Sequence, residues 1–186
     1  MADPRRLATA TQVIIGAQAV LQVAVGVAGG TGSALFVWTL PVSVLLYFGG
    51  IMVFLCWFRR CRLNAEVFAP GTHRYPPGFA VGAWFIPLAM WWIPRRVALD
   101  VHRASGTGGG ARVVDAWWAA WLAKTLGGAI VIRFQAHPDG FSPYHLVTGV
   151  AAAALAVLFV RQVTAGQDEK VHADLAALPF APTPAA

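Results

Sequence analysis

Charged side chains are scarce in this sequence. Asp, Glu, Lys and Arg make up 12% of its 186 residues, whereas a typical soluble domain has about 25%. Hydrophobic residues make up 58% and gather in unbroken runs. A bilayer is the natural solvent for runs of that length, and helices satisfy their own backbone there. The composition therefore predicts an all-α integral membrane protein.

Cysteine and the usual catalytic motifs are also scarce. Cys56 and Cys61 are the two cysteines, and their spacing fits neither a disulfide on a helix nor a zinc pattern. Paired carboxylates, a nucleophile with a base, and a metalloprotease motif are missing, which argues against a hydrolase. The glycine-rich residues 105–111 lack the GK[ST] of a phosphate loop, so we interpret them as a linker.

Four segments have the length and apolarity of membrane-spanning helices. Two lie in the first third of the chain, at 11–30 and 35–58, and two follow at 113–134 and 144–163. Basic residues before the first segment also occur in signal peptides, but its three glutamines argue against a cleaved one. Residues 166–186 are charged and then rich in Pro and Ala, which predicts a disordered cytoplasmic tail.

The apolar segment 79–94 allows two topologies. It is shorter than the roughly 17 residues that a span needs, and Pro87 and Pro94 interrupt it. It either crosses the membrane as a fifth span or forms a Pro-broken hairpin that re-enters or lies in the interface. Residues 95–105 follow as a short amphipathic helix.

The basic residues favour the hairpin, because Lys and Arg stay on the cytoplasmic side. Five spans divide them evenly between the two faces. Four spans leave Arg133 outside and Lys124 within the membrane and make both termini cytoplasmic. The cytoplasmic set is then Arg5, Arg6, Arg59, Arg60, Arg62, Arg74, Arg95, Arg96, Arg103, Arg112, Arg161 and Lys170. Anionic lipids are the expected partner of this face, and nucleic acid is not, since no polar scaffold carries the charge.

A series of motifs resembles a bacterial membrane family, domain of unknown function 4328. The series runs from Trp57-Phe58-Arg59-Arg60 with Asn64, through residues 82–87 (GAWFIP) and Trp92-Ile93-Pro94, to Asp100, Arg103-Ala104-Ser105 and Trp117-Trp118. The resemblance implies a multi-pass protein of the bacterial cytoplasmic (inner) membrane and implies no activity. Asp100 stands where the family pattern has a glutamate, and Lys124 lies in a helix that is usually neutral.

Lys124 is the most unusual residue in a predicted span. A charged side chain at that depth is usually functional, or it extends to the interface. The one carboxylate within the four predicted spans, Asp115, lies at the start of its helix, more than two turns before Lys124. Lys124 therefore has no evident counter-ion and is expected to face a wet cavity or an anionic ligand. The residues expected to line such a ligand site with it are Gln18, Gln22, Tyr47, Trp84, Trp91, Trp92 and Trp121.

Two further groups of residues have candidate roles. His137, Asp139 and His145 in the loop before the last span carry zinc or copper ligand types, although histidines are common in interface loops. No other cofactor is expected. Asn64 and an Arg96/Asp100 pair are candidates for holding the hairpin to the end of the second span.

The sequence leaves three classes of function open. The leading one is a non-enzymatic binding, transport-associated or assembly component that holds a hydrophobic small molecule or forms a homo-oligomer. The second is an enzyme acting on a hydrophobic or lipid-like substrate near Lys124. The third is an oligomeric channel, because four short helices enclose little pore.

Overall fold

The fold was analysed in a computed structural model that describes residues 3–106, 111–134 and 143–176. Every regular element in these ranges is helical. Three helices, α1 (Arg5–Val27), α2 (Ala34–Phe68) and α7 (Pro143–Ala176), are long and apolar enough to cross a membrane. The predicted all-α class with membrane helices is therefore confirmed at this level.

The first two helices form an antiparallel pair. Between them lies a short 3₁₀ turn, η1 (Gly30–Gly32), where Gly29 and Gly30 have φ of 109° and 76°. Glycine adopts these left-handed angles without steric cost. Ser33 then caps α2 by accepting a hydrogen bond from the Phe36 N–H at 3.2 Å.

Residues 79–94 form a bent segment and no long helix. A single helical turn, α3 (Phe79–Gly82), is followed by a bend and a 3₁₀ turn, η2 (Ala89–Trp91). Leu88 has φ of 67° at the bend, an angle that non-glycine residues rarely adopt. The amphipathic helix α4 (Ile93–Ala104) follows with Pro94 in its first turn, and it buries Val97 and Val101 while Arg103 is exposed.

The region predicted as one span at 113–134 consists of three consecutive helical pieces. These are α5 (Arg112–Leu122), a π-helical segment η3 (Ala123–Gly127) and α6 (Gly128–Phe134). The hydroxyl of Tyr144 in α7 donates to the Ala123 carbonyl at 2.5 Å. Gly127 leaves room for this contact, since a Cβ there would overlap the Tyr144 hydroxyl.

The predicted disordered tail is helical in its first part, because α7 continues to Ala176. Gly166 and Gln167 are buried there, and the Lys170 ammonium lies 5.6 Å from the centroid of the Phe68 ring. These contacts with the rest of the bundle stabilise helix where the composition alone favours disorder. Residues 177–186 lie outside the described part of the chain.

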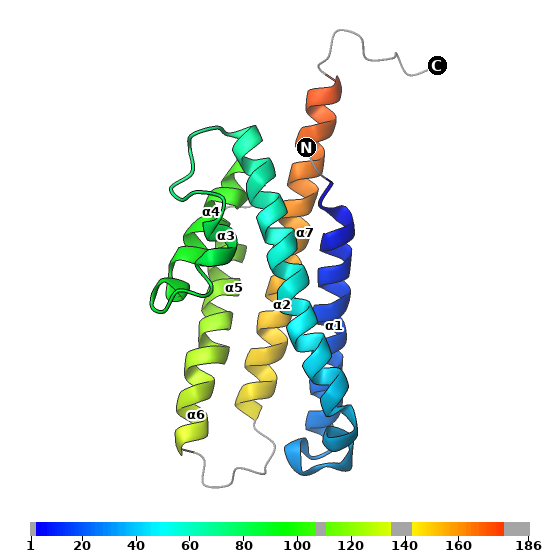
Figure 1. The fold of residues 1–186 in the computed structure, drawn as a ribbon. Helices are drawn as coiled ribbons and strands as arrows, with labels where there is room; N and C mark the ends of the chain where they lie inside the picture. Colours follow the sequence, from blue (N-terminus) through cyan, green and yellow to red (C-terminus); the bar gives the residue numbers. More distant parts are fainter. Residues whose placement is uncertain (1–2, 107–110, 135–142, 177–186) are drawn as a thin grey trace, which may run out of the picture.

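The long helices run up and down in one bundle (Figure 1). α1 packs against α2 and α7, and α5 packs against α7. α3 and α4 lie beside the upper halves of α2 and α5, at the end where α1 begins and α7 ends (Figure 1). An ion pair between Arg5 and Asp168 joins these two helix ends.

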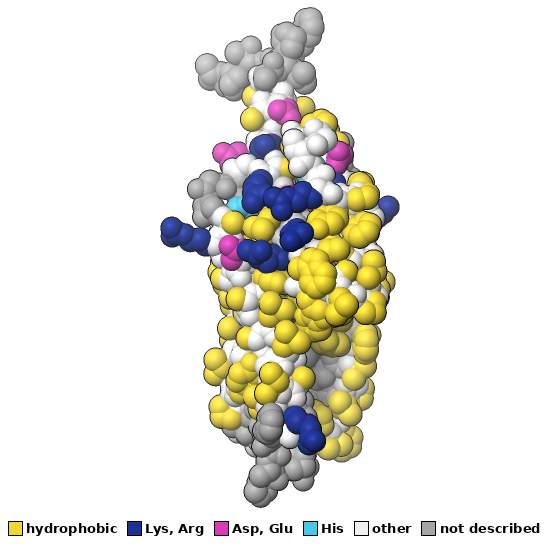
Figure 2. Space-filling model, turned by 90° about the vertical axis from the view of Figure 1, so that its left-hand side faces the viewer, with side chains coloured by type: hydrophobic (Ala, Val, Ile, Leu, Met, Phe, Trp, Pro, Cys, Tyr) yellow, Lys and Arg dark blue, Asp and Glu magenta, His cyan; other side chains and the backbone are white. Residues whose placement is uncertain are grey.

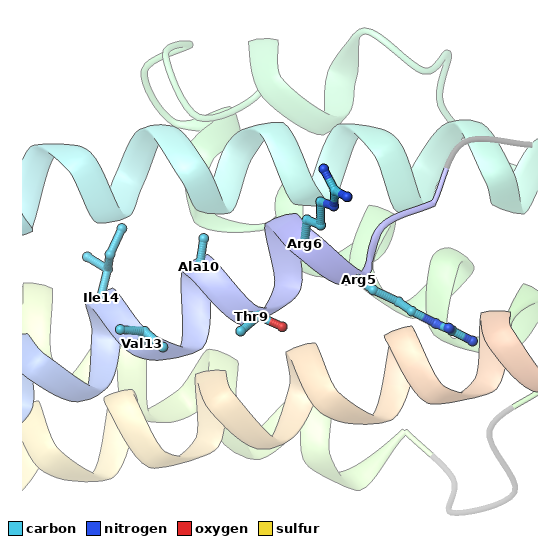
Figure 3. Close-up of a pocket in the computed structure, with 6 residues that line it drawn as sticks. All are labelled: Arg5, Arg6, Thr9, Ala10, Val13 and Ile14. Atoms are coloured by element: carbon cyan, nitrogen blue, oxygen red, sulfur yellow. The ribbon is translucent and has the colours of Figure 1, made fainter.

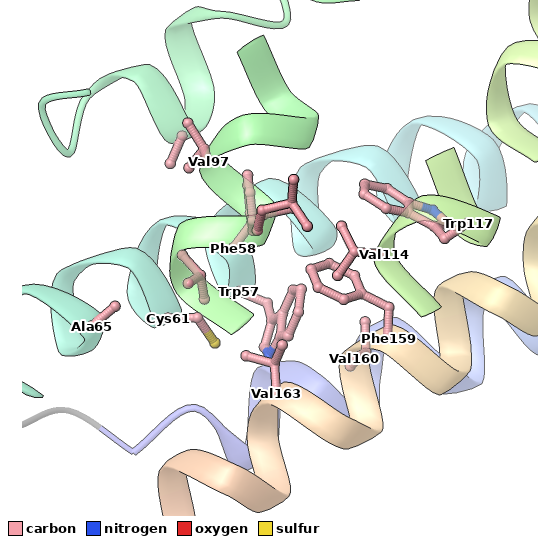
Figure 4. Packing of buried hydrophobic residues seen from close by; sticks show 14 of the residues in the cluster. Trp57, Phe58, Cys61, Ala65, Val97, Val114, Trp117, Phe159, Val160 and Val163 are labelled. Atoms are coloured by element: carbon pink, nitrogen blue, oxygen red, sulfur yellow. The ribbon is translucent and has the colours of Figure 1, made fainter. Parts of the chain in front are cut away.

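Aromatic residues fill the core at the same level as α4. Trp57 and Phe58 are fully buried, and Phe159 of α7 stacks on Trp117 at 4.9 Å between ring centroids. Figure 4 shows Trp57 close to Val160 and Val163 of α7. Such ring pairs each add about 0.5–1.5 kcal/mol to burial, so this cluster anchors α2, α4, α5 and α7 to one another.

Candidate functional site

A cavity of about 460 Å³ lies between the long helices and the bent segment 79–94. We call it the central cavity. α1, α2, the bent segment, α5 with η3, and α7 each contribute lining residues, and most of these are apolar. The polar or indole-bearing side chains that line it include Gln18, Gln22, Tyr47, Trp84, Trp117, Trp121, Lys124 and Thr125.

The cavity brings together six of the eight residues predicted to bind a ligand, and Trp91 and Trp92 do not line it. Trp91 packs on Trp121 at 5.7 Å between ring centroids, so it contacts a cavity-lining residue without lining the cavity itself. Trp92 is 46% exposed on the outer side of the bent segment.

Lys124 enters the cavity from the π-helical segment η3. None of the described residues forms a hydrogen bond or an ion pair with its ammonium group. The neighbouring Thr125 hydroxyl donates to the Trp121 carbonyl at 2.8 Å. Single π-helical turns inside α-helices occur often at functional sites, and this one carries the cavity's single charged lining residue among those described.

The two glutamines of α1 that line the cavity, Gln18 and Gln22, differ in their bonding. The Gln22 amide donates to the His145 carbonyl at 2.8 Å, and a Cβ on Gly149 would overlap the Gln22 amide. Gly149 thus lets α1 and α7 approach closely at this point. The Gln18 side-chain oxygen is buried without a hydrogen-bond partner among the described residues.

Trp84 forms the wall of the cavity at the bent segment. Its ring meets Trp121 edge to face at 5.4 Å and Trp118 at 5.9 Å, and it also contacts Phe54 of α2 at 6.1 Å. Its indole N–H is buried and has no partner among the described residues. Buried indole N–H groups usually find an acceptor.

The residues predicted to hold the hairpin take different partners. The Asn64 amide donates to Gln167 at 3.0 Å, and the Gln167 amide donates to the Cys61 carbonyl at 2.9 Å and to the Ser105 hydroxyl at 3.3 Å. This buried network joins α2, the end of α4, and α7.

Arg96 and Asp100 do not pair with each other in the described structure. The Arg96 guanidinium donates to the Tyr75 hydroxyl at 3.1 Å, while Asp100 accepts from Arg103 and from the Arg74 N–H. Both residues nonetheless connect α4 to the 69–78 loop. Tyr75 and Arg74 of the loop thus provide partners for Arg96 and Asp100, and Arg103 of α4 is a second partner of Asp100.

The same loop buries His73 beside Glu66. The two side chains lie 3.3 Å apart, and 2% of the His73 side chain is exposed. Burial lowers the pKa of His73 below its usual 6.5, and the charge of Arg62 lowers it further, against smaller opposite effects of Glu66 and Asp100. Burial likewise lowers the pKa of His102 in α4.

The predicted metal ligands fall largely outside the described residues. His137 and Asp139 lie in the undescribed range 135–142, and His145 lies in the first turn of α7. Within the described ranges, no group of three or more His, Cys, Asp or Glu side chains has the arrangement of a metal site. Zinc or copper binding at this loop stays a prediction.

A comparison with known protein families shows the family to which the chain belongs. A family described as Domain of unknown function (DUF4328) matches residues 5–166. The chain belongs to this family. The match to DUF4328 covers α1 through most of α7 and includes every residue that lines the central cavity. No curated protein and no solved structure matches the chain.

Sequence reasoning missed the residues that shape the cavity indirectly. Gln167 lay in the predicted tail, and Tyr144 and Gly127 gave no local signal that they meet across two helices. The available hint was that Gly127 lies about one helical turn after Lys124 in an apolar segment, since small residues let membrane helices approach closely.

Proposed function

We propose that this DUF4328 protein binds a hydrophobic small molecule in the central cavity, within the membrane, without acting on it chemically. One observation carries the proposal: Lys124 lines the cavity and has no described partner for its charge. An unpaired charge deep in a bilayer costs about 2.5–3.5 kcal/mol on insertion scales. A bound molecule that accepts hydrogen bonds from Lys124 would offset that cost.

The lining favours binding over catalysis. None of the described lining residues is an Asp, Glu, His, Cys or Ser. A nucleophile with a neighbouring base, or an acid–base pair, therefore has no side chains to form it except Lys124, Tyr47 and Thr125. A mostly apolar pocket with a few convergent polar groups is the usual form of a small-molecule site.

The proposal includes a topology of four spans. α1, α2, the combined α5–η3–α6 rod and α7 cross the membrane, and the end of the bundle where α1 begins faces the cytoplasm. The Lys and Arg side chains support this orientation, because they gather over the end that carries α3 and α4, above a broad apolar band (Figure 2). Arg133, near the end of α6, is at the opposite end.

In this topology the bent segment 79–94 re-enters from the cytoplasmic side. Its tip exposes Phe85, Ile86 and Leu88, which suits contact with acyl chains. Its first turn, α3, packs against α2, and the Trp84 ring contacts three tryptophans of α5; protein contacts of this kind are what irregular backbone at membrane depth requires.

Anionic lipid headgroups are the proposed partners of the cytoplasmic face. A shallow groove of about 580 Å³ beside the first turns of α1 supports this. In it Arg6 points toward α2, and Arg5 points toward α7, where it pairs with Asp168; the apolar residues Ala10 and Val13 lie further along α1 (Figure 3). Basic side chains above an apolar groove complement a phosphate and its acyl chain.

Co-purification tests the proposed function. The wild-type protein, Lys124→Met and the control Leu126→Met would be purified in mild detergent and extracted with organic solvent for mass spectrometry. Leu126 lies on η3 but does not line the cavity. We expect a hydrophobic compound that is enriched in wild type and control and reduced at least several-fold in Lys124→Met. Identical extracts from all three proteins would contradict the proposal.

A further inference from the structure

Two nitrogen donors line the central cavity and point to the chemistry of its ligand. The Trp84 indole N–H is buried without a described acceptor, and the Lys124 ammonium lines the same space without one. Trp121 lines the cavity as well and meets Trp84 edge to face at 5.4 Å. A buried donor without an acceptor is unfavourable, so an occupant that supplies acceptor oxygens to both groups would satisfy them together.

Gln18 adds a third polar contact from α1. Its side-chain oxygen is buried and unpartnered among the described residues. A half-turn of the amide exchanges this oxygen for the amino group, and the two orientations have almost the same shape. The Gln18 amide therefore presents a donor to an anion or an acceptor to a hydroxyl on the same head group.

The remaining walls are apolar, and the volume limits the size of the occupant. Ile14, Phe54, Leu55 and Met90 are among the apolar lining residues. The cavity's 460 Å³ equals roughly fifteen liquid-water volumes. One heavy atom of a fatty chain takes up about one such water volume. The cavity therefore has room for a single fatty chain and is much too small for a two-chain phospholipid.

The cavity reaches the surface between α2 and the bent segment. Tyr47, Ile51 and Phe85 line it while 52%, 39% and 69% of these residues, respectively, are exposed. Their side chains form an aromatic and aliphatic mouth on the apolar band of the bundle. A ligand that partitions into lipid could therefore enter from the side.

We propose that the occupant is a single-chain amphiphile with an anionic head group, either a carboxylate or a phosphate. Lys124 and the Trp84 indole N–H bind the head group, Gln18 completes its hydrogen bonds, and the chain lies along the apolar walls toward Tyr47 and Phe85. This inference rests on the proposed binding function and specifies the ligand class of the same site.

A binding series in detergent micelles tests the ligand class. Delipidated protein would be titrated with palmitate, hexadecyl phosphate and hexadecanol, which share one chain length, and the bound fraction would be read by native mass spectrometry. We expect one molecule per chain and an affinity for at least one of the anions about tenfold or more above that for the alcohol, because hydrogen bonds to charged groups are the stronger ones. Preference for palmitate identifies a carboxylate, and preference for hexadecyl phosphate identifies a phosphate.

Variants connect that preference to the named side chains. Lys124→Met should lower the affinity for the preferred anion about tenfold or more and leave hexadecanol unchanged, while Lys124→Arg should keep the preference for the anion. Trp84→Phe, which keeps a ring but removes the N–H, should lower anion affinity several-fold. Leu126→Met should match the wild type.

Two outcomes would overturn the inference. Equal binding of the alcohol and both anions, with no effect of Lys124→Met, would show that charge does not select the ligand. Failure of all three probes to bind would exclude the single-chain class. Neither outcome contradicts the proposed function, which fails when the organic extracts of wild type and Lys124→Met are identical.

Discussion

Gln167 connects three helices through one side-chain amide. It is 1% exposed and bonds to Asn64, to the Cys61 carbonyl and to Ser105. A buried amide with all its partners in place specifies one arrangement of its neighbours. The same residue type on the surface would contribute little.

Replacing Gln167 with Leu should destabilise the protein strongly. The change removes the buried hydrogen bonds that Gln167 makes to Asn64, to the Cys61 carbonyl and to Ser105, and each such bond contributes about 0.5–1.5 kcal/mol. We expect a clear fall in the unfolding temperature in detergent. Glu169→Gln, on an exposed position of the same helix, serves as the control and should leave the temperature unchanged. Equal temperatures for wild type and Gln167→Leu would refute the structural role.

Tyr144 and Gly127 should behave as a coupled pair. Gly127→Ala forces the new Cβ against the Tyr144 hydroxyl and should disturb the bond to Ala123. Its cost in stability should be smaller in a Tyr144→Phe background, where that hydroxyl is gone, giving a coupling energy of about 0.5–3 kcal/mol. A thermal-unfolding cycle of the four proteins measures it, and strict additivity would rule out the contact.

At the scale of elements, the 69–78 loop should loosen in mild acid. Because the pKa of His73 is lowered by burial, the unfolded loop takes up a proton at a higher pH than the folded one. Stability is therefore full above the usual pKa of 6.5 and is lost as pH falls from there toward the lowered value. His102 contributes with the same sign.

Measuring the unfolding temperature between about pH 8 and pH 5 checks this expectation, with the window set around the ordinary histidine pKa. His73→Gln should flatten part of the decline, and His73→Gln with His102→Gln should flatten more of it. A decline that is identical in wild type and both variants would assign the pH dependence to other groups.

Hydrophobic run length predicted the positions of the four long helical regions, because apolar runs of that size have few alternatives to helix. It did not predict their ends. Residues 59–68 of α2 and 164–176 of α7 are polar enough to look like loop, and they are helical because Asn64 and Gln167 bond across the bundle. The π-helical segment at Lys124 was also missed, and the Tyr144 bond at its first residue, Ala123, comes from another helix and has no signal in the local sequence.

The site was easier to predict than the elements around it. Lys124, Gln18 and Gln22 are polar residues in apolar helices, and their polarity is visible without a structure. Their convergence on one cavity follows from the bundle, which places α1 and α5 on either side of α7. Trp92 was predicted to face inward, but the bend at Leu88 leaves it exposed.

At the scale of the whole molecule, the distribution of Lys and Arg side chains is the basis of the proposed four-span topology. A C-terminal reporter should report a cytoplasmic location. In a Cys56→Ser, Cys61→Ala background, Arg133→Cys should be labelled by a membrane-impermeant maleimide in intact cells, and Arg103→Cys should be labelled only after lysis. Labelling of both cysteines in intact cells, or an external C-terminus, would contradict the four-span arrangement.

The central claim is that the cavity beside Lys124 holds a ligand. Native mass spectrometry of the protein, purified from its membrane without added lipid, tests it most directly. We expect the wild-type spectrum to show a species heavier than the bare chain by one discrete ligand mass, and the Lys124→Met spectrum to show that species strongly reduced. A wild-type spectrum with the bare chain alone, or an adduct of equal abundance in Lys124→Met, would contradict the account.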